Sequence, residues 1–311
     1  MADAFARPLP ALTPEQRYYL DVNGYVVIPN VLSADEVAEL MEAIHGLKDA
    51  LLHLPPGTRI RNAHLLRGID TMTVGSPVEA HPAITAYCTH PRLVGMAEEL
   101  IGGDARICEV GAIINRRAAP GSAPFAYSFH TGTDIPFASH VKNGLYHCSF
   151  VKTLTNLTEL RSADDGGTVV IAGSHKIDLP AETIIAAAMK DPRLIHQVVA
   201  PAGSTLLFSE TLLHSTAQIR SDRERTILIC GYNARVMPSW DSSPYTPEFV
   251  ARLPESHRAL FLGVAHWTRG PRYRTLDQPA DPTAYANHPW HAHDPERRVE
   301  AERREPVATM V

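Results

Sequence analysis

The sequence has few cysteines, no excess of positive charge and no long hydrophobic run. Only four cysteines occur in 311 residues, widely scattered and without a CxxC or other metal-binding spacing, which is typical of a reduced intracellular protein. The net charge of -5 gives no electrostatic basis for binding a nucleic-acid polymer. No stretch approaches the length of a membrane span, and no positively charged start followed by an apolar run appears at the N-terminus. These absences predict a cytoplasmic protein without membrane attachment.

The composition is that of a globular protein, with 44% hydrophobic and 20% charged residues, and its 25 prolines favour turns over long helices. Thr13 and Gln16 form a predicted capping box around a first helix, and Ser33 and Glu36 open a second one. Tyr25-Val26-Val27-Ile28 reads as a short buried strand between them. Further helices are expected over 91–100, 181–190 and 247–262.

Short strand-like segments separated by turns begin near residue 107. They cover 107–114, 146–154, 168–171, 196–199, 204–208 and 226–232. This spacing is typical of an antiparallel sandwich or barrel. We therefore expect a single domain, mainly β with flanking helices. A helical region at about 13–105 is followed by the strand-rich core at about 106–235 and an extension at about 236–311.

Two elements of the sequence suggest a site for an acidic ligand. His214 follows a predicted strand, and Arg225 begins the next one. A guanidinium binds a carboxylate through two parallel charge-assisted hydrogen bonds. Thr216 would point to the same side as His214 if the segment is extended. The alternative is that Arg225 belongs to a charged hairpin turn over 220–225, and the spacing does not decide between the two.

Three motifs together resemble the phytanoyl-CoA dioxygenase-like branch of the iron(II)/2-oxoglutarate oxygenases. They are Gly24-Tyr25-Val26-Val27 with Leu32-Ser33, Gly173-Ser174-His175-Lys176, and His214 with Arg225. The resemblance covers about residues 13–235 and implies a double-stranded β-helix (jelly-roll, cupin-like) core. It also implies that His130 and His214 bind Fe(II), that Thr216 and Arg225 bind 2-oxoglutarate, and that O2 is the oxidant. His175 matches a structural turn in the family.

The chain departs from the family at its first iron-binding motif, which is His-x-Asp in the family and His130-Thr131-Gly132 here. Glycine cannot bind a metal, so the facial triad of two histidines and one carboxylate is incomplete. Non-haem iron halogenases, which this feature resembles, carry glycine or alanine at that place. The favoured prediction is a halogenase that chlorinates an unactivated C–H bond, with chloride next to Gly132 and with Thr131 and Thr133 beside it.

Three alternatives stay open. A hydroxylase could take its carboxylate from Asp134, although an extended strand would carry that residue roughly 13 Å beyond His130. Glu210 is a weaker candidate for the same role. The chain could also be an inactive relative that has lost its metal, or a jelly-roll protein that binds an acidic metabolite without catalysis.

We expect the substrate to be a free small molecule. Arg61, Arg116 and Arg117 are candidates for binding a phosphate or another anion, as are Arg59, Arg67, Lys142 and Lys152. Among halogenases, the chain most resembles those that act on a nucleotide, such as 2′-deoxyadenosine monophosphate in the biosynthesis of chlorinated nucleoside antibiotics. No motif in the sequence reads a base or a ribose.

Overall fold

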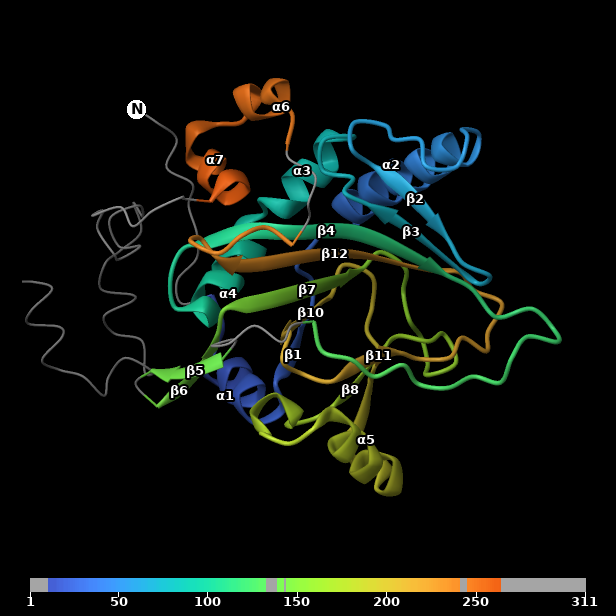
Figure 1. The fold of residues 1–311 in the computed structure, drawn as a ribbon, viewed down its shortest axis with the longest axis vertical. Coiled ribbons are helices and arrows are strands. Elements are labelled where there is room, and N and C mark those ends of the chain that lie inside the picture. Colours follow the sequence, from blue (N-terminus) through green and yellow to red (C-terminus); the bar gives the residue numbers. More distant parts are fainter. Residues whose placement is uncertain (1–10, 133–138, 143, 241–244, 264–311) are drawn as a thin grey trace, which may run out of the picture.

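A computed structural model describes residues 11–132, 139–142, 144–240 and 245–263 (Figure 1). Its helices are α1 (Pro14–Asn23), α2 (Ala34–Leu52), α3 (Pro82–Cys88), α4 (Pro91–Ile101), α5 (Ala181–Lys190), α6 (Pro247–Arg252) and α7 (Glu255–Leu262), with 3-10 turns at Ser174–Lys176 and Pro192–Leu194. Its strands are β1 (Tyr25–Ile28), β2 (His64–Arg67), β3 (Thr71–Gly75), β4 (Ala105–Asn115), β5 (Ser139–Lys142), β6 (Leu145–Cys148), β7 (Phe150–Asn156), β8 (Thr168–Ile171), β9 (Ile195–Val198), β10 (Thr205–Ser209), β11 (His214–Thr216) and β12 (Arg225–Ala234).

The strands form a large and a small antiparallel sheet. The large sheet has seven strands in the order β1-β10-β7-β12-β4-β3-β2, and the small one has the order β11-β8-β9. Strands β5 and β6 form a separate hairpin. In Figure 1 helices α2, α3, α6 and α7 lie on one side of the large sheet, while β8, β11 and α5 lie on the other.

Residues of β10 and β12 alternate between two hydrophobic cores. Leu207 and Leu228 belong to the large core that also contains buried residues of α2, α3 and α4. Leu206, Phe208 and Ile227 belong to a second core with Val170 of β8, between the two sheets. Because successive strand residues face opposite sides of a sheet, this alternation places the large sheet between the helices and the small sheet. The predicted mainly β fold with flanking helices is confirmed.

The first two helices begin as the sequence predicted. Thr13 and Gln16, and likewise Ser33 and Glu36, form reciprocal capping boxes at the starts of α1 and α2. The region that we expected to be helical, about 13–105, also contributes three strands to the large sheet, namely β1, β2 and β3. The jelly-roll therefore extends into this region and is not confined to about 106–235.

The predicted helix over 247–262 is wrong in its continuity. Two helices, α6 and α7, replace it, with Leu253 in an extended conformation between them. Pro254 explains the break, since proline disfavours a helical conformation at the residue before it. In the described ranges, no helix is long and apolar enough to span a membrane.

Candidate metal and 2-oxoglutarate site

His130 and His214 lie directly opposite each other on two paired extended segments. Each backbone N–H donates to the carbonyl of the other residue, at 3.0 Å in both directions. Directly opposed residues of an antiparallel pair project to the same face. The two imidazole rings accordingly lie together, with centroids 4.3 Å apart. The structure thus brings together the two histidines that the sequence places 84 residues apart.

Backbone carbonyls fix the tautomer of both rings. Nδ1 of His130 lies 2.8 Å from the carbonyl of Ser128, and Nδ1 of His214 lies 2.9 Å from the carbonyl of Leu212. A carbonyl only accepts hydrogen bonds, so each Nδ1 donates a proton and Nε2 is the nitrogen left to other partners. Burial lowers the pKa of His214 to about 3, which keeps this ring neutral. In both rings Nε2 is therefore the nitrogen available to a metal.

The space beside Gly132 is filled by another side chain. A Cβ atom built on Gly132 would stand 1.4 Å from Oε2 of Glu210. The backbone joins the same two residues, because the N–H of Gly132 donates to the carbonyl of Glu210 at 3.0 Å. The open space that we expected next to Gly132 for a halide therefore holds the Glu210 carboxylate in this structure.

Glu210 is fully buried and paired with a lysine. Its Oε1 lies 2.8 Å from Nζ of Lys152, which also lies 3.1 Å from Oε2 of Glu109. Burial acts to lower the pKa of Lys152, but the two carboxylates outweigh it and the pKa lies above its ordinary value. Oε2 of Glu210 has no hydrogen-bond partner among the described residues. Lys152 was a candidate for substrate anions, and in the structure its charge is directed at Glu210.

Arg225 is buried at the start of β12, with two neutral side chains as partners. Its guanidinium donates to Oγ1 of Thr168 at 3.3 Å and to Oδ1 of Asn115 at 3.5 Å, and its Nε has no partner in the described part of the chain. Burial lowers its pKa to about 10, and no acidic group of the described residues acts against that effect. A buried guanidinium without a carboxylate partner is costly, and an acidic ligand would relieve that cost.

Thr216 reaches this part of the site through strand pairing. It lies opposite Thr168 in the register of β11 and β8, two residues from the pair His214 and Val170. Since Val170 belongs to the core between the sheets, the same face of the small sheet carries His214, Thr168 and Thr216. Thr168, rather than Thr216, supplies the hydroxyl that Arg225 contacts.

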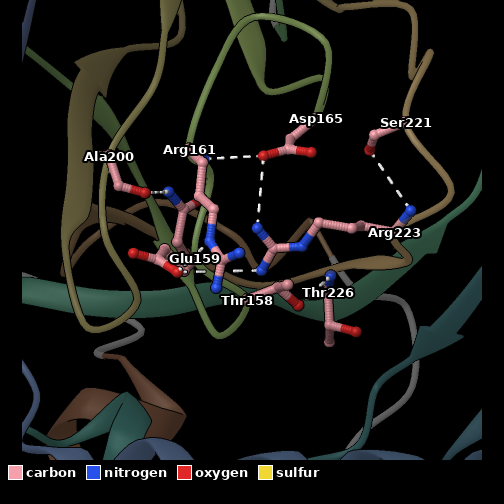
Figure 2. Close-up of polar contacts among 9 residues, drawn as sticks. Thr158, Glu159, Arg161, Asp165, Ala200, Ser221, Arg223 and Thr226 are labelled. Carbon is pink, nitrogen blue, oxygen red and sulfur yellow. Dashed lines mark hydrogen bonds and ion pairs between the residues drawn. The ribbon is translucent and has the colours of Figure 1, made fainter.

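A polar network holds the turn that leads into Arg225 (Figure 2). Arg223 reaches Asp165 at 3.5 Å, and the backbone N–H of Arg161 donates to the same carboxylate at 2.8 Å. The N–H of Thr226 donates to Oγ1 of Thr158 at 2.9 Å. Hydrogen bonds from Ser221 and from the Arg161 backbone keep the pKa of Asp165 below its usual value. The loop that carries residues 158–165 therefore holds Arg223 and Thr226, which lie on either side of Arg225 in the chain.

The remaining predicted site residues are not gathered at the histidines. Arg61 is exposed in a turn with positive φ, and Arg116 and Arg117 are exposed beyond the end of β4. Arg117 pairs with Asp222 at 2.7 Å. Thr131 is half-buried next to His130. Thr133 and Asp134 lie outside the described residues, so the alternative that uses Asp134 as a ligand stays a prediction.

His175 has the structural role that the turn motif implied. It is buried in the 3-10 turn Ser174–Lys176, and its Nε2 lies 3.2 Å from the carbonyl of Asp21. Burial lowers its pKa to about 4. Its ring packs edge-on against Tyr146, so this histidine connects the turn to α1 and β6.

The donor set fits Fe(II) and a dicarboxylate. In the described ranges, no three His, Cys, Asp or Glu side chains are already close enough to form a complete metal site. The two histidines nevertheless lie together, and Gly132, two residues after His130, borders a buried Glu210 whose Oε2 has no hydrogen-bond partner among the described residues. Imidazole and carboxylate ligands suit Fe(II), and the unneutralised Arg225 suits the far carboxylate of 2-oxoglutarate.

The comparisons with known proteins define the class. The model of the phytanoyl-CoA dioxygenase family matches residues 20–227, which is more than half of the chain. The chain therefore belongs to this family, and it is an enzyme of the iron- and 2-oxoglutarate-dependent dioxygenase kind.

Three relatives illustrate the likeness. The L-proline trans-4-hydroxylase of Streptomyces griseoviridis is 22% identical over 266 residues, covering 78% of this chain and 92% of that one. HygX of Streptomyces hygroscopicus with nickel and 2-oxoglutarate bound has a TM-score of 0.61 at 21% identity, covering 76% of this chain and 94% of that one. The α-ketoglutarate-dependent epimerase SnoN from nogalamycin biosynthesis has a TM-score of 0.53 at 20% identity, covering 72% and 84%. At these identities the structural likeness concerns the fold.

Sequence reasoning underrated Glu210 and missed Thr168 and Asn115. A signal for Glu210 is present, since it is a lone charge in the apolar run Leu206-Leu207-Phe208-Ser209-Glu210-Thr211-Leu212-Leu213. Charged side chains are rarely buried unless they are paired or functional. No comparable signal marks Thr168 or Asn115, because their nearness to Arg225 depends on the register of β8 and β4.

Proposed function

We propose that this enzyme is a hydroxylase that uses Fe(II), 2-oxoglutarate and O2 to insert one oxygen atom into a C–H bond of a free small molecule. The observation that carries the proposal is the buried carboxylate of Glu210 in the side-chain space of Gly132. A halide needs open space and the absence of a competing anion at that position. Here an anionic oxygen already fills the space, and this favours hydroxylation over halogenation.

Bound Fe(II) and 2-oxoglutarate supply the activation of O2, with succinate and CO2 as co-products. The residues of this chain supply the geometry. The carbonyls of Ser128 and Leu212 hold the Nδ1 atoms of the two imidazoles, so that the Nε2 atoms would be the ones to bind the metal. Arg225 binds the far carboxylate of 2-oxoglutarate, and Thr168 and Asn115 orient the guanidinium for that contact.

The proposal is tested by the masses of the products. The purified enzyme is incubated with Fe(II), 2-oxoglutarate, O2 and saturating chloride, together with a panel of amino acids and nucleotides. The panel contains L-proline, because a relative is a proline hydroxylase, and 2′-deoxyadenosine monophosphate. We expect substrate-dependent succinate formation and a product heavier by one oxygen atom. A chlorinated product would overturn the proposal.

Halogenation is the second candidate, and Gly132 is the observation that favours it. This residue contributes no ligand of its own, and the ammonium group of Lys152 would balance a halide if Glu210 turned away. The product assay with and without chloride separates the two candidates. Metabolite binding without catalysis predicts no succinate in either condition.

A further inference from the structure

Glu210 and Gly132 occupy complementary positions, and this complementarity extends the iron site proposed above. We propose that Glu210 is the carboxylate ligand of the metal and that it takes the place of the side chain that residue 132 lacks. The ligand has moved from the segment of His130 to the segment that precedes His214. The inference rests on the proposed Fe(II) site, but not on which reaction that site performs.

The position of Gly132 brings Glu210 to the segment of His130. Gly132 follows His130 by two residues, at a bend in the backbone, and its N–H donates to the carbonyl of Glu210 at 3.0 Å. In an aspartate at this position, the carboxyl carbon would stand about 1.5 Å from Cβ, the length of one C–C bond. Oε2 of Glu210 stands 1.4 Å from that Cβ position. A carboxylate oxygen of Glu210 thus overlaps the space that the side chain of such an aspartate would enter.

Glu210 carries a buried carboxylate oxygen without a hydrogen-bond partner among the described residues. The side chain is fully buried, and Oε2 lacks a hydrogen-bond partner among the described residues. An ionised oxygen buried without a partner is strongly destabilising. A cation bound between this oxygen and the two Nε2 atoms would remove that cost.

Lys152 holds the Glu210 carboxylate through its other oxygen. Its ammonium lies 2.8 Å from Oε1, which leaves Oε2 as the oxygen that faces Gly132. Carboxylates that bind metals are commonly held by a hydrogen bond or ion pair to the other oxygen. Lys152 is therefore a positioning residue, and Glu109 anchors it from the opposite side at 3.1 Å.

The pair also explains why residue 132 is glycine. Any larger side chain would collide with the Glu210 carboxylate, whose Cδ lies within 2.4 Å of the Cβ position. Only glycine leaves room for a glutamate that reaches in from the neighbouring segment. In this proposal, Glu210 supplies the carboxylate that residue 132 lacks.

Metal affinity tests the inference without any turnover. Binding of Co(II) to the metal-free enzyme is measured by calorimetry and by the visible absorption of Co(II), without 2-oxoglutarate or O2. We expect Glu210→Gln, which keeps the size of the side chain, to weaken binding about tenfold or more. Glu79→Gln is the matched control, since Glu79 is also a buried glutamate but is hydrogen-bonded to Asn62 and Thr246, and we expect nearly unchanged affinity. The exchange variant Gly132→Asp with Glu210→Gly should regain the affinity that Glu210→Gly alone loses.

A crystal structure of the unmodified enzyme with Mn(II) provides a measurement that does not depend on whether the variants fold. The anomalous signal should place the metal next to His130 and His214, with an oxygen of Glu210 at about 2.2 Å. A metal bound by both histidines with Glu210 out of reach would overturn the inference, as would wild-type Co(II) affinity in Glu210→Gln. A chlorinated product combined with a Glu210-bound metal would contradict the proposed function and leave this inference standing.

Discussion

Replacing Gly132 with alanine should destabilise the protein through one identifiable collision. The new methyl group would occupy the position that Oε2 of Glu210 now holds, so the carboxylate must move away. Glu210 is fully buried and its Oε1 is bound to Lys152, which leaves it little freedom to do so. The backbone of Gly132 itself imposes no penalty, because it has no positive φ.

A lower and an upper bound can be given for the loss in free energy of unfolding caused by Gly132→Ala. Overpacking a buried site costs about 1–3 kcal/mol, whereas breaking a buried ion pair outright costs about 3–5 kcal/mol. Glu109 remains beside Lys152 and would compensate for part of the lost pairing. We therefore expect Gly132→Ala to lower the free energy of unfolding by about 2–3 kcal/mol.

Urea unfolding of the metal-free protein measures the loss of stability caused by Gly132→Ala. Two further variants show whether the collision with Glu210 is its cause. Gly46→Ala is the control, because a Cβ there meets nothing within 4 Å and alanine in the interior of α2 should add up to about 1 kcal/mol of stability. In a Glu210→Gly background, Gly132→Ala should cost less than about 1 kcal/mol, which gives a coupling of roughly 2 kcal/mol. An equal loss in both backgrounds would refute the proposed complementarity.

Three more predictions follow from groups around the site. Arg225→Gln should weaken 2-oxoglutarate binding by roughly ten- to a hundredfold, because it removes a charged hydrogen bond of about 1.5–3 kcal/mol. An unchanged Kd in anaerobic calorimetry would contradict this. In the folded protein His175 has a pKa of about 4, below its usual 6.5. Its contribution to the free energy of unfolding is therefore present at neutral pH and is lost as the pH falls from 6.5 to about 4. His175→Gln should reduce the pH dependence of stability in this range, as measured by urea unfolding. The pKa of Asp165 is lowered, so wild type should exceed Asp165→Asn in stability above about pH 4, and the two should converge in more acidic urea titrations.

The fold was accessible from the sequence because its strands and helix starts are locally encoded. The alternation of Leu206, Leu207 and Phe208 between two cores follows from strand periodicity, and Thr13 shows its capping role in the sequence itself. Pro254 also marks the break between α6 and α7 in the sequence itself, although we predicted one continuous helix over 247–262.

The site was only partly accessible. His130 and His214 were found through resemblance, whereas Glu210 follows Gly132 by 78 residues and no local pattern brings the two together. Their contact depends on backbone pairing between distant segments, from the N–H of Gly132 to the carbonyl of Glu210. A missing ligand in a motif is therefore weak evidence about the reaction until the space next to it has been seen.

The central claim is that this chain binds Fe(II) and 2-oxoglutarate together at His130, His214 and Arg225. Adding both to the enzyme without O2 should produce a visible charge-transfer band that saturates at one equivalent of each. The band should be absent in His214→Ala and should require more 2-oxoglutarate in Arg225→Gln. A wild-type enzyme that shows no band at saturating Fe(II) and 2-oxoglutarate would contradict the account.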